Sequence, residues 1–165
     1  LGYYFIATRF FIIYAFLVSP FHSIYTYIAS ENDSDIENFR KVIYIAVVIS
    51  LLFSVILYIS HPLILVFFNL DQNEFASVSN LVPYMLISGF LYTIYTILNT
   101  FRLINTPGLV SFEWIILSLF YLSFLFILPS YYGINGFIYA QILSYLIIIS
   151  FVLLKLKYNK GNAIN

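Results

Sequence analysis

Two ionisable side chains, Arg9 and Glu113, fall inside long apolar stretches of the sequence. A charge held within a lipid bilayer costs a few kcal/mol or more, so such residues are candidates for function. In a helix, Arg9 lies about 12 Å along the axis from Leu1. From there it could extend outward to lipid headgroups, or its planar guanidinium could bind a phosphate or a carboxylate. The sequence leaves both interpretations open.

Glu113 follows a short turn that contains Pro107. If the stretches on either side of this turn pack antiparallel, Glu113 lies level with Asn99 and near Arg102. An ion pair at the membrane interface is the favoured interpretation. A carboxylate that couples transport to a cation is the alternative.

The remaining candidate residues indicate binding rather than catalysis. Tyr92 and Tyr95 flank a turn of a predicted helix and could stack on sugars. The Asp33–Asp35 stretch imitates a metal motif of sugar transferases, but it lies in a short polar segment that cannot form a nucleotide-binding fold. His22 and His61 are about one membrane thickness apart, and the chain has no Cys. We therefore expect no catalytic residue, no metal and no cofactor, and we do not expect an enzyme.

The composition is that of a membrane protein. Hydrophobic residues make up 62% of the 165 residues and charged residues 8%, with a mean hydropathy of +0.97, whereas soluble domains carry about a quarter charged residues. The formal net charge is zero, which gives no basic face for a nucleic acid. The opening LGYYFIATRF lacks the charged start of a signal peptide. We expect a piece of a longer protein, either natural or trimmed.

Stretches of about 20 apolar residues predict an all-α membrane fold with five transmembrane helices. Barrel strands would alternate in short segments, whereas these stretches are apolar all round. We expect the first helix to end at Pro20, with 21–28 as an extension along the interface. A capping box at Ser34–Glu37 should start the second helix. A polar loop covers 30–41, a tail covers 156–165, and the expected helices span residues 2–19, 42–60, 81–103, 109–128 and 136–155.

Basic residues accompany alternate connections between these helices. The first connection, the third connection and the tail hold Arg40, Lys41, Arg102, Lys155, Lys157 and Lys160, and the second and fourth connections hold none. Positive residues favour the cytoplasmic side of a membrane. The pattern therefore predicts a cytoplasmic C-terminal tail and a first helix that enters from outside.

The stretch YYGINGFIYAQILSYLI contains small residues that a purely lipid-facing helix does not need. Gly133 and Gly136 are expected to bracket a turn with positive φ. Gly136 and Ala140 are four residues apart, which is the spacing of a close helix-packing face. Close packing is the favoured role of this stretch, and direct contact with a substrate is the alternative.

Three stretches resemble polysaccharide and O-antigen flippases of the multidrug/oligosaccharidyl-lipid/polysaccharide exporter superfamily: YGINGFIYAQILSYLI, LGYYFIATRF and LNTFRLINTPG. The order of the elements between them is also similar. The resemblance covers essentially the whole chain and implies the last five helices of a two-bundle exporter. Asn69 stands where many relatives have Gly, and Asn tolerates the left-handed conformation that Gly provides.

The resemblance implies export of an undecaprenyl-pyrophosphate-linked oligosaccharide across the bacterial cytoplasmic membrane, during biosynthesis of surface polysaccharide such as lipopolysaccharide. Its implied partners are the lipid-linked oligosaccharide, membrane lipids and the first bundle of the same protein, and Arg9, Tyr92 and Tyr95 are expected along the substrate path. A cation-coupled drug exporter of the same superfamily is an alternative. A membrane polysaccharide polymerase or ligase is another, although the external connections are short and hold no base.

Overall fold

Five long helices make up the part of the chain that the computed structural model describes, residues 2–31, 36–105 and 107–162. Within these ranges, side chains are described except at residues 22, 25, 26, 28–31, 36–40, 101–105, 107–111, 113 and 155–162. The helices are α1 (Gly2–Glu31), α2 (Ile36–Val66), α3 (Gln72–Asn105), α4 (Pro107–Tyr132) and α5 (Ile134–Asn162). All five are long and apolar enough to cross a membrane. The predicted all-α multi-pass membrane fold is confirmed.

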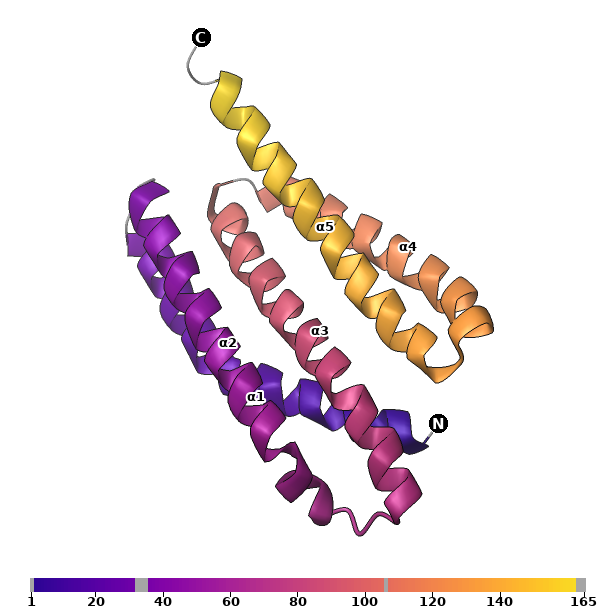
Figure 1. Cartoon of the computed structure of the whole chain (residues 1–165). Helices are drawn as coiled ribbons and strands as arrows, with labels where there is room; N and C mark the ends of the chain where they lie inside the picture. Colours follow the sequence, from indigo (N-terminus) through magenta and orange to yellow (C-terminus); the bar gives the residue numbers. More distant parts are fainter. Residues whose placement is uncertain (1, 32–35, 106, 163–165) are drawn as a thin grey trace.

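The central helix of the bundle is α3, which packs on α1 and α2 on one side and on the α4–α5 hairpin on the other (Figure 1). The ends of α1, α3 and α5 and the starts of α2 and α4 gather at one end of the bundle (Figure 1). Lys41, Arg102 and Lys155 belong to these helix ends. The helix ends that carry the basic residues thus lie on one side of the bundle. This is the arrangement expected when successive helices cross the membrane in opposite directions.

Prolines do not end the helices, contrary to the prediction at Pro20. Helix α1 continues through Pro20 to Glu31, and α2, α3 and α4 contain Pro62, Pro83 and Pro129. Proline lacks an N–H, so the carbonyl four residues earlier loses its helical partner. Membrane helices tolerate this when neighbouring groups take over the freed carbonyl. Helix boundaries drawn at prolines were therefore wrong, and the helices are longer than expected. The part of α1 that could span a membrane nevertheless ends at Phe21, and α1 continues beyond it, which agrees with the predicted extension of the first helix.

The connection between α2 and α3 is shorter than predicted because α3 begins at Gln72 rather than at Leu81. Two reciprocal hydrogen bonds cap the start of α3. The Glu74 N–H donates to the Asp71 carboxylate at 2.8 Å, and the Asp71 N–H donates to the Glu74 carboxylate at 3.2 Å. This is the arrangement of a capping box. The capping box that was predicted, Ser34–Glu37, begins outside the described residues, and α2 starts within it at Ile36.

Two tight connections use the left-handed backbone conformation. Asn69, which follows α2, has a φ of 48°, and Gly133, between α4 and α5, has a φ of 57°. The Gly133 N–H donates to the Pro129 carbonyl at 2.9 Å, and the Gly136 N–H donates to the Gly133 carbonyl at 3.0 Å. The positive φ predicted for this turn is confirmed at Gly133. Helix α5 then runs on to Asn162, so most of the predicted tail is helical.

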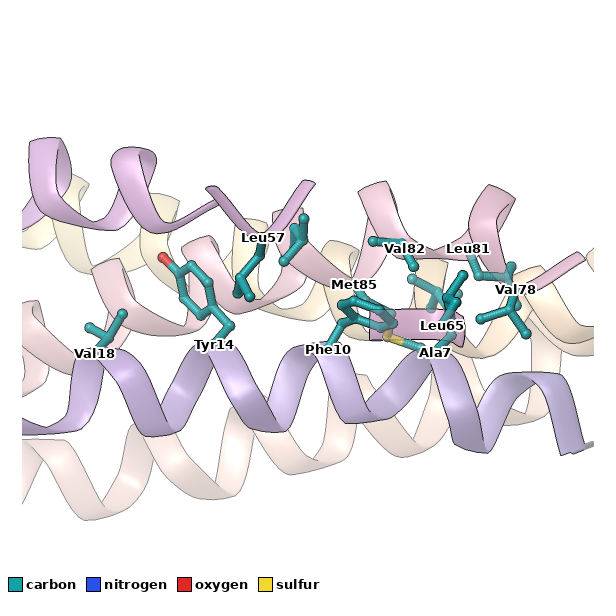
Figure 2. Close-up of a cluster of buried hydrophobic side chains, with 12 residues drawn as sticks. Ala7, Phe10, Tyr14, Val18, Leu57, Leu65, Val78, Leu81, Val82 and Met85 are labelled. Atoms are coloured by element: carbon teal, nitrogen blue, oxygen red, sulfur yellow. The ribbon is translucent and has the colours of Figure 1, made fainter. Parts of the chain in front are cut away.

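The larger hydrophobic core lies where α1 crosses α2 and α3. Ala7, Phe10, Tyr14 and Val18 form one stripe of α1 (Figure 2). Their spacing of three or four residues places them on a single helix face. A second core on the other side of α3 is formed by Tyr95, Leu98, Leu117, Ile148, Ile149 and Val152. With a core on each side, α3 holds the two halves of the bundle together.

Candidate functional site

A pocket of about 210 Å³ lies between α4 and α5, inside the stretches of both helices that could span a membrane. We call it the α4–α5 pocket. Its residues combine aromatic rings, hydroxyls and an amide, and they are Trp114, Leu117, Ser118, Tyr121, Gln141, Ser144 and Tyr145. Polar groups gathered in one hollow of two otherwise apolar helices indicate a binding site.

The polar groups of the pocket offer both hydrogen-bond donors and acceptors. The Ser118 hydroxyl donates to the Trp114 carbonyl at 2.8 Å, and the Ser144 hydroxyl donates to the Ala140 carbonyl at 2.7 Å. Their protons are used within their own helices, so the hydroxyl oxygens remain as acceptors. The Gln141 amide lies beside the Tyr145 hydroxyl and supplies two N–H donors. The pocket therefore suits a ligand that both donates and accepts.

A series of ring contacts connects this pocket with α1. Phe11 of α1 contacts Tyr92 of α3 with ring centroids 5.7 Å apart, and Tyr92 contacts Tyr145 of α5 at 6.0 Å. Tyr145 also contacts Tyr95 at 6.0 Å, and Tyr95 contacts Trp114 of α4 at 5.2 Å. These separations are typical of favourable aromatic pairs. We call these five rings the aromatic series.

A second hollow, of about 410 Å³, lies at the other end of the aromatic series, between α1 and α3. We call it the α1–α3 groove. It is lined by Phe11, Ile12, Ala15, Phe16, Ser19 and Tyr92. Arg9 does not line the groove, but it precedes Ile12 by one turn and is exposed on the same face of α1. The structure thus places Arg9 beside the groove rather than within the bundle.

The two predicted sugar-stacking tyrosines are brought together but differ in access. Tyr92 is half-buried and lines the α1–α3 groove, whereas Tyr95 is fully buried between Tyr145 and Trp114. In this conformation only Tyr92 is open to a ligand. Tyr95 instead supports the rings that line the α4–α5 pocket.

The predicted cluster around Glu113 is described only at Asn99, because the side chains of Arg102 and Glu113 lie outside the described part of the structure. Asn99 is 3% exposed, and neither its amide oxygen nor its amide nitrogen has a hydrogen-bond partner among the described side chains. The ion pair of Glu113 with Arg102 stays a prediction.

The small residues of the α4–α5 turn position the pocket. A Cβ on Gly136 would lie 2.5 Å from backbone atoms of Leu128 and Pro129, so the two helices are in backbone contact there. Ala140, one turn later, is fully buried. Gln141 follows on the neighbouring face and reaches the pocket. Close packing on one face and a polar lining on the next explain why both kinds of residue occur in this stretch.

Several pocket residues were not singled out from the sequence, although their spacing carries a signal. On α4, Trp114, Ser118 and Tyr121 are four and three residues apart. On α5, Ser144 and Tyr145 follow Gln141 by three and four residues. Residues three or four apart share a helix face. A polar and aromatic stripe on an otherwise apolar helix could have indicated the pocket.

The side chains described in the α4–α5 pocket offer hydrogen-bonding groups and aromatic rings. The lining of the α4–α5 pocket includes no carboxylate, imidazole or amine. No group of three or more His, Cys, Asp or Glu residues that could hold a metal ion occurs among the described residues. Comparisons with protein-family models, curated proteins and solved structures found no match.

Proposed function

We propose that this chain is the C-terminal part of a polysaccharide-type flippase, which moves an undecaprenyl-pyrophosphate-linked oligosaccharide across the bacterial cytoplasmic membrane. The observation that carries the proposal is the α4–α5 pocket, in which an amide, hydroxyls and aromatic rings meet within lipid-spanning helices. A sugar ring both donates and accepts hydrogen bonds and packs its C–H faces on aromatic rings. Lipid offers neither kind of contact, so a sugar needs such a lining to cross.

The charged part of this substrate is proposed to bind near Arg9. The guanidinium presents a planar set of donors that matches phosphate oxygens. Arg9 is exposed beside the α1–α3 groove, and the aromatic series links this groove to the α4–α5 pocket. The pyrophosphate would then bind on the α1 side while the sugars contact Tyr92 and the pocket. Flipping breaks no covalent bond, and the chain needs only to offer successive polar contacts.

The proposed orientation is supported by the basic residues that lie at the helix ends on one side of the bundle. We propose that this end, with the end of α5, faces the cytoplasm. Large apolar side chains such as Phe16 and Phe126 are 78% and 81% exposed. These faces would contact lipid and the first bundle of the same protein. Because alternating access requires two bundles, we do not expect this chain to transport by itself.

The test uses the complete protein in cells whose surface polysaccharide depends on it. Gln141→Ala removes the amide from the α4–α5 pocket and should lower surface polysaccharide roughly two- to tenfold, which corresponds to the net loss of about one hydrogen bond. Membrane abundance should stay at the wild-type level. Leu146→Ala is the matched control, because Leu146 lies on the same helix, is 43% exposed and does not line the pocket.

The location of the accumulated intermediate separates the proposed function from its alternatives. A flippase defect leaves lipid-linked oligosaccharide on the cytoplasmic leaflet. Accumulation on the outer leaflet would instead indicate a polymerase or ligase. Normal polysaccharide combined with increased drug sensitivity would indicate a drug exporter, and either result would contradict the flippase.

A further inference from the structure

A third hollow, of about 310 Å³, lies between α2 and α3 and shares no lining residue with the α4–α5 pocket or the α1–α3 groove. We call it the α2–α3 groove. On α2 it is lined by Leu51, Ser54, Val55 and Tyr58, and on α3 by four residues with the same spacing from Pro83 to Phe90. Residues three, four and seven apart share one face of a helix. The groove therefore runs along both helices for about 10 Å, the rise of seven helical residues.

Helices α2 and α3 contact each other beyond both ends of the α2–α3 groove. On one side, His61 Nε2 of α2 lies 2.8 Å from the Ser79 hydroxyl of α3. On the other side, Ala46 of α2 and Ile97 of α3 belong to one buried cluster. The inner wall includes Leu86, which is part of the core between α1, α2 and α3 (Figure 2). The groove is therefore bounded at its ends and on its inner side.

The open side of the groove is continuous with the lipid-facing surface of the bundle. Val55 and Ile87 line the groove and are 53% and 47% exposed. Leu52 and Ile56 lie beside the groove on α2 and are also exposed. All four residues belong to the stretches of α2 and α3 that could span a membrane. What reaches the groove from this side must therefore pass through lipid.

The groove lies near the middle of the membrane span. The spanning stretch of α2 is Lys41–Val66. At 1.5 Å per residue, Leu51 is about 15 Å from Lys41, and Tyr58 is about 12 Å from Val66. The hydrocarbon core of a bilayer is about 30 Å thick, so the chains of each leaflet end at about this depth. The molecules that surround the groove are therefore the ends of lipid chains.

The lining of the groove matches a hydrocarbon and not a polar ligand. The described lining residues include no charged side chain. The Ser54 hydroxyl donates to the Ser50 carbonyl at 3.0 Å, and the Tyr58 ring stacks on His61 at 5.4 Å. A polar group buried without a hydrogen-bond partner costs free energy, whereas an alkyl chain has no polar group to satisfy. The groove thus favours an alkyl chain.

The width of the groove excludes another helix as the occupant. A volume of about 310 Å³ over a length of about 10 Å leaves a cross-section of about 30 Å², or a width of about 6 Å. An α-helix with its side chains is about 10 Å wide. Carbon atoms of neighbouring chains pack about 4 Å apart, so one alkyl chain fits within the width.

We propose that the α2–α3 groove binds the end of one acyl chain of a membrane phospholipid. Lipid chains are as apolar as the lining, so the hydrophobic effect gives no preference for the groove. The preference comes from van der Waals contacts, because a chain in the groove touches two helices and the inner wall instead of one surface. Because only the chain end is held, the site does not select a headgroup. This inference does not depend on the transport function.

The test is photo-crosslinking of the full-length protein in phospholipid nanodiscs. A small fraction of the phospholipid carries a diazirine at the end of one acyl chain, and peptide mass spectrometry locates the label after irradiation. Val55 and Ile87 should be labelled about threefold or more above Leu52 and Ile56, which corresponds to a few additional carbon contacts. The comparison is matched, because Leu52 and Ile56 are exposed on α2 at the same depth and do not line the groove.

Two variants test whether the groove itself causes this preference. Ile87→Trp fills the groove and should reduce the labelling of Val55 to that of Leu52. Leu52→Trp adds the same bulk outside the groove and should leave the labelling of Val55 and Ile87 unchanged. Exchanging phosphatidylglycerol for phosphatidylethanolamine as the labelled lipid should also change nothing.

Four results would overturn the proposal. Equal labelling of Val55 and Leu52 would show ordinary lipid contact only. Labelling of Leu52 without Val55 and Ile87 would show that another part of the protein covers the groove. A dependence on the headgroup would place recognition outside the groove. Stronger displacement of the label by a polyprenyl phosphate than by the same amount of phospholipid would identify a branched chain as the occupant.

Discussion

Gly136 of α5 lies so close to Leu128 of α4 that a Cβ on the glycine would meet the Leu128 carbonyl carbon at 2.5 Å. The atoms in the way belong to the backbone, so no rotamer change can make room. This contact closes the α4–α5 hairpin one turn from Gly133 and sets the spacing of the helices that line the pocket.

Gly136→Ala should therefore destabilise the hairpin. Overpacking of this kind typically costs about 1–3 kcal/mol, and Gly136→Leu should cost more. The measurement is the folded yield of the full-length protein in detergent, by size-exclusion chromatography. Gly2→Ala is the control, since nothing lies within 4 Å of a Cβ at Gly2. Unchanged yield and activity of Gly136→Leu would refute the close-packing role.

Gly89 supports a second close contact, in which the ring of Tyr14 lies against α3. A Cβ on Gly89 would be 2.6 Å from a ring carbon of Tyr14, whose hydroxyl donates to the Ser50 carbonyl at 3.3 Å. Gly89→Ala should displace the ring and lower the thermal midpoint of unfolding. In the Gly89→Ala/Tyr14→Ala double variant, the methyl added at position 89 no longer meets a ring. The double variant should therefore be less destabilised than the sum of the two single changes predicts. Strictly additive effects would show that the contact is unimportant.

Because the basic residues lie at one end of the bundle, the orientation of the bundle in the membrane can be tested. A reporter that is active only in the cytoplasm should be active when fused after Lys160 and inactive when inserted at Gln72. Gln72 begins α3 at the opposite end of the bundle from the end of α5 (Figure 1). The reverse pattern would invert the proposed orientation and weaken the case for the flippase.

The number and class of the helices could be predicted because apolar length is a local property of the sequence. Boundaries at Pro20 and near Pro62 and Pro129 could not, because whether proline ends a membrane helix depends on what replaces the lost hydrogen bond. At Pro62 the carbonyl that lost its helical partner is that of Tyr58, and it is contacted by the ring of His61. That ring is in turn held by Ser79, and sequence spacing alone does not bring these two residues together.

The candidate site was predictable only in part. The backbone contact of Gly136 follows from a spacing rule within one stretch. The α4–α5 pocket depends on how two helices rotate about their axes, and that rotation is set by the contact of Gly136 with Leu128 and Pro129. Tyr145 joins Tyr92, Tyr95 and the pocket only after this rotation is fixed.

The last prediction concerns Arg9, on the exposed face of α1 that also carries Phe5 and Ile12. If Arg9 binds the pyrophosphate, Arg9→Ala loses charge-assisted hydrogen bonds worth about 1.5–3 kcal/mol. Surface polysaccharide should then fall by about ten- to a hundredfold at unchanged membrane abundance. Arg9→Lys should restore part of it, because lysine keeps the charge but not the two-pronged geometry.

A matched control and a labelling experiment separate this role from a simple headgroup anchor. Phe5→Ala lies one turn earlier on the same exposed face of α1 and should leave polysaccharide display unchanged. An arginine that only reaches lipid headgroups would be fully replaced by lysine. Arg9→Cys should react with a charged thiol reagent added from outside, because a water-filled path admits the reagent whereas lipid excludes it. Full polysaccharide display by Arg9→Ala would remove Arg9 from the path, and the sugar contacts of the α4–α5 pocket would then have to carry recognition without it.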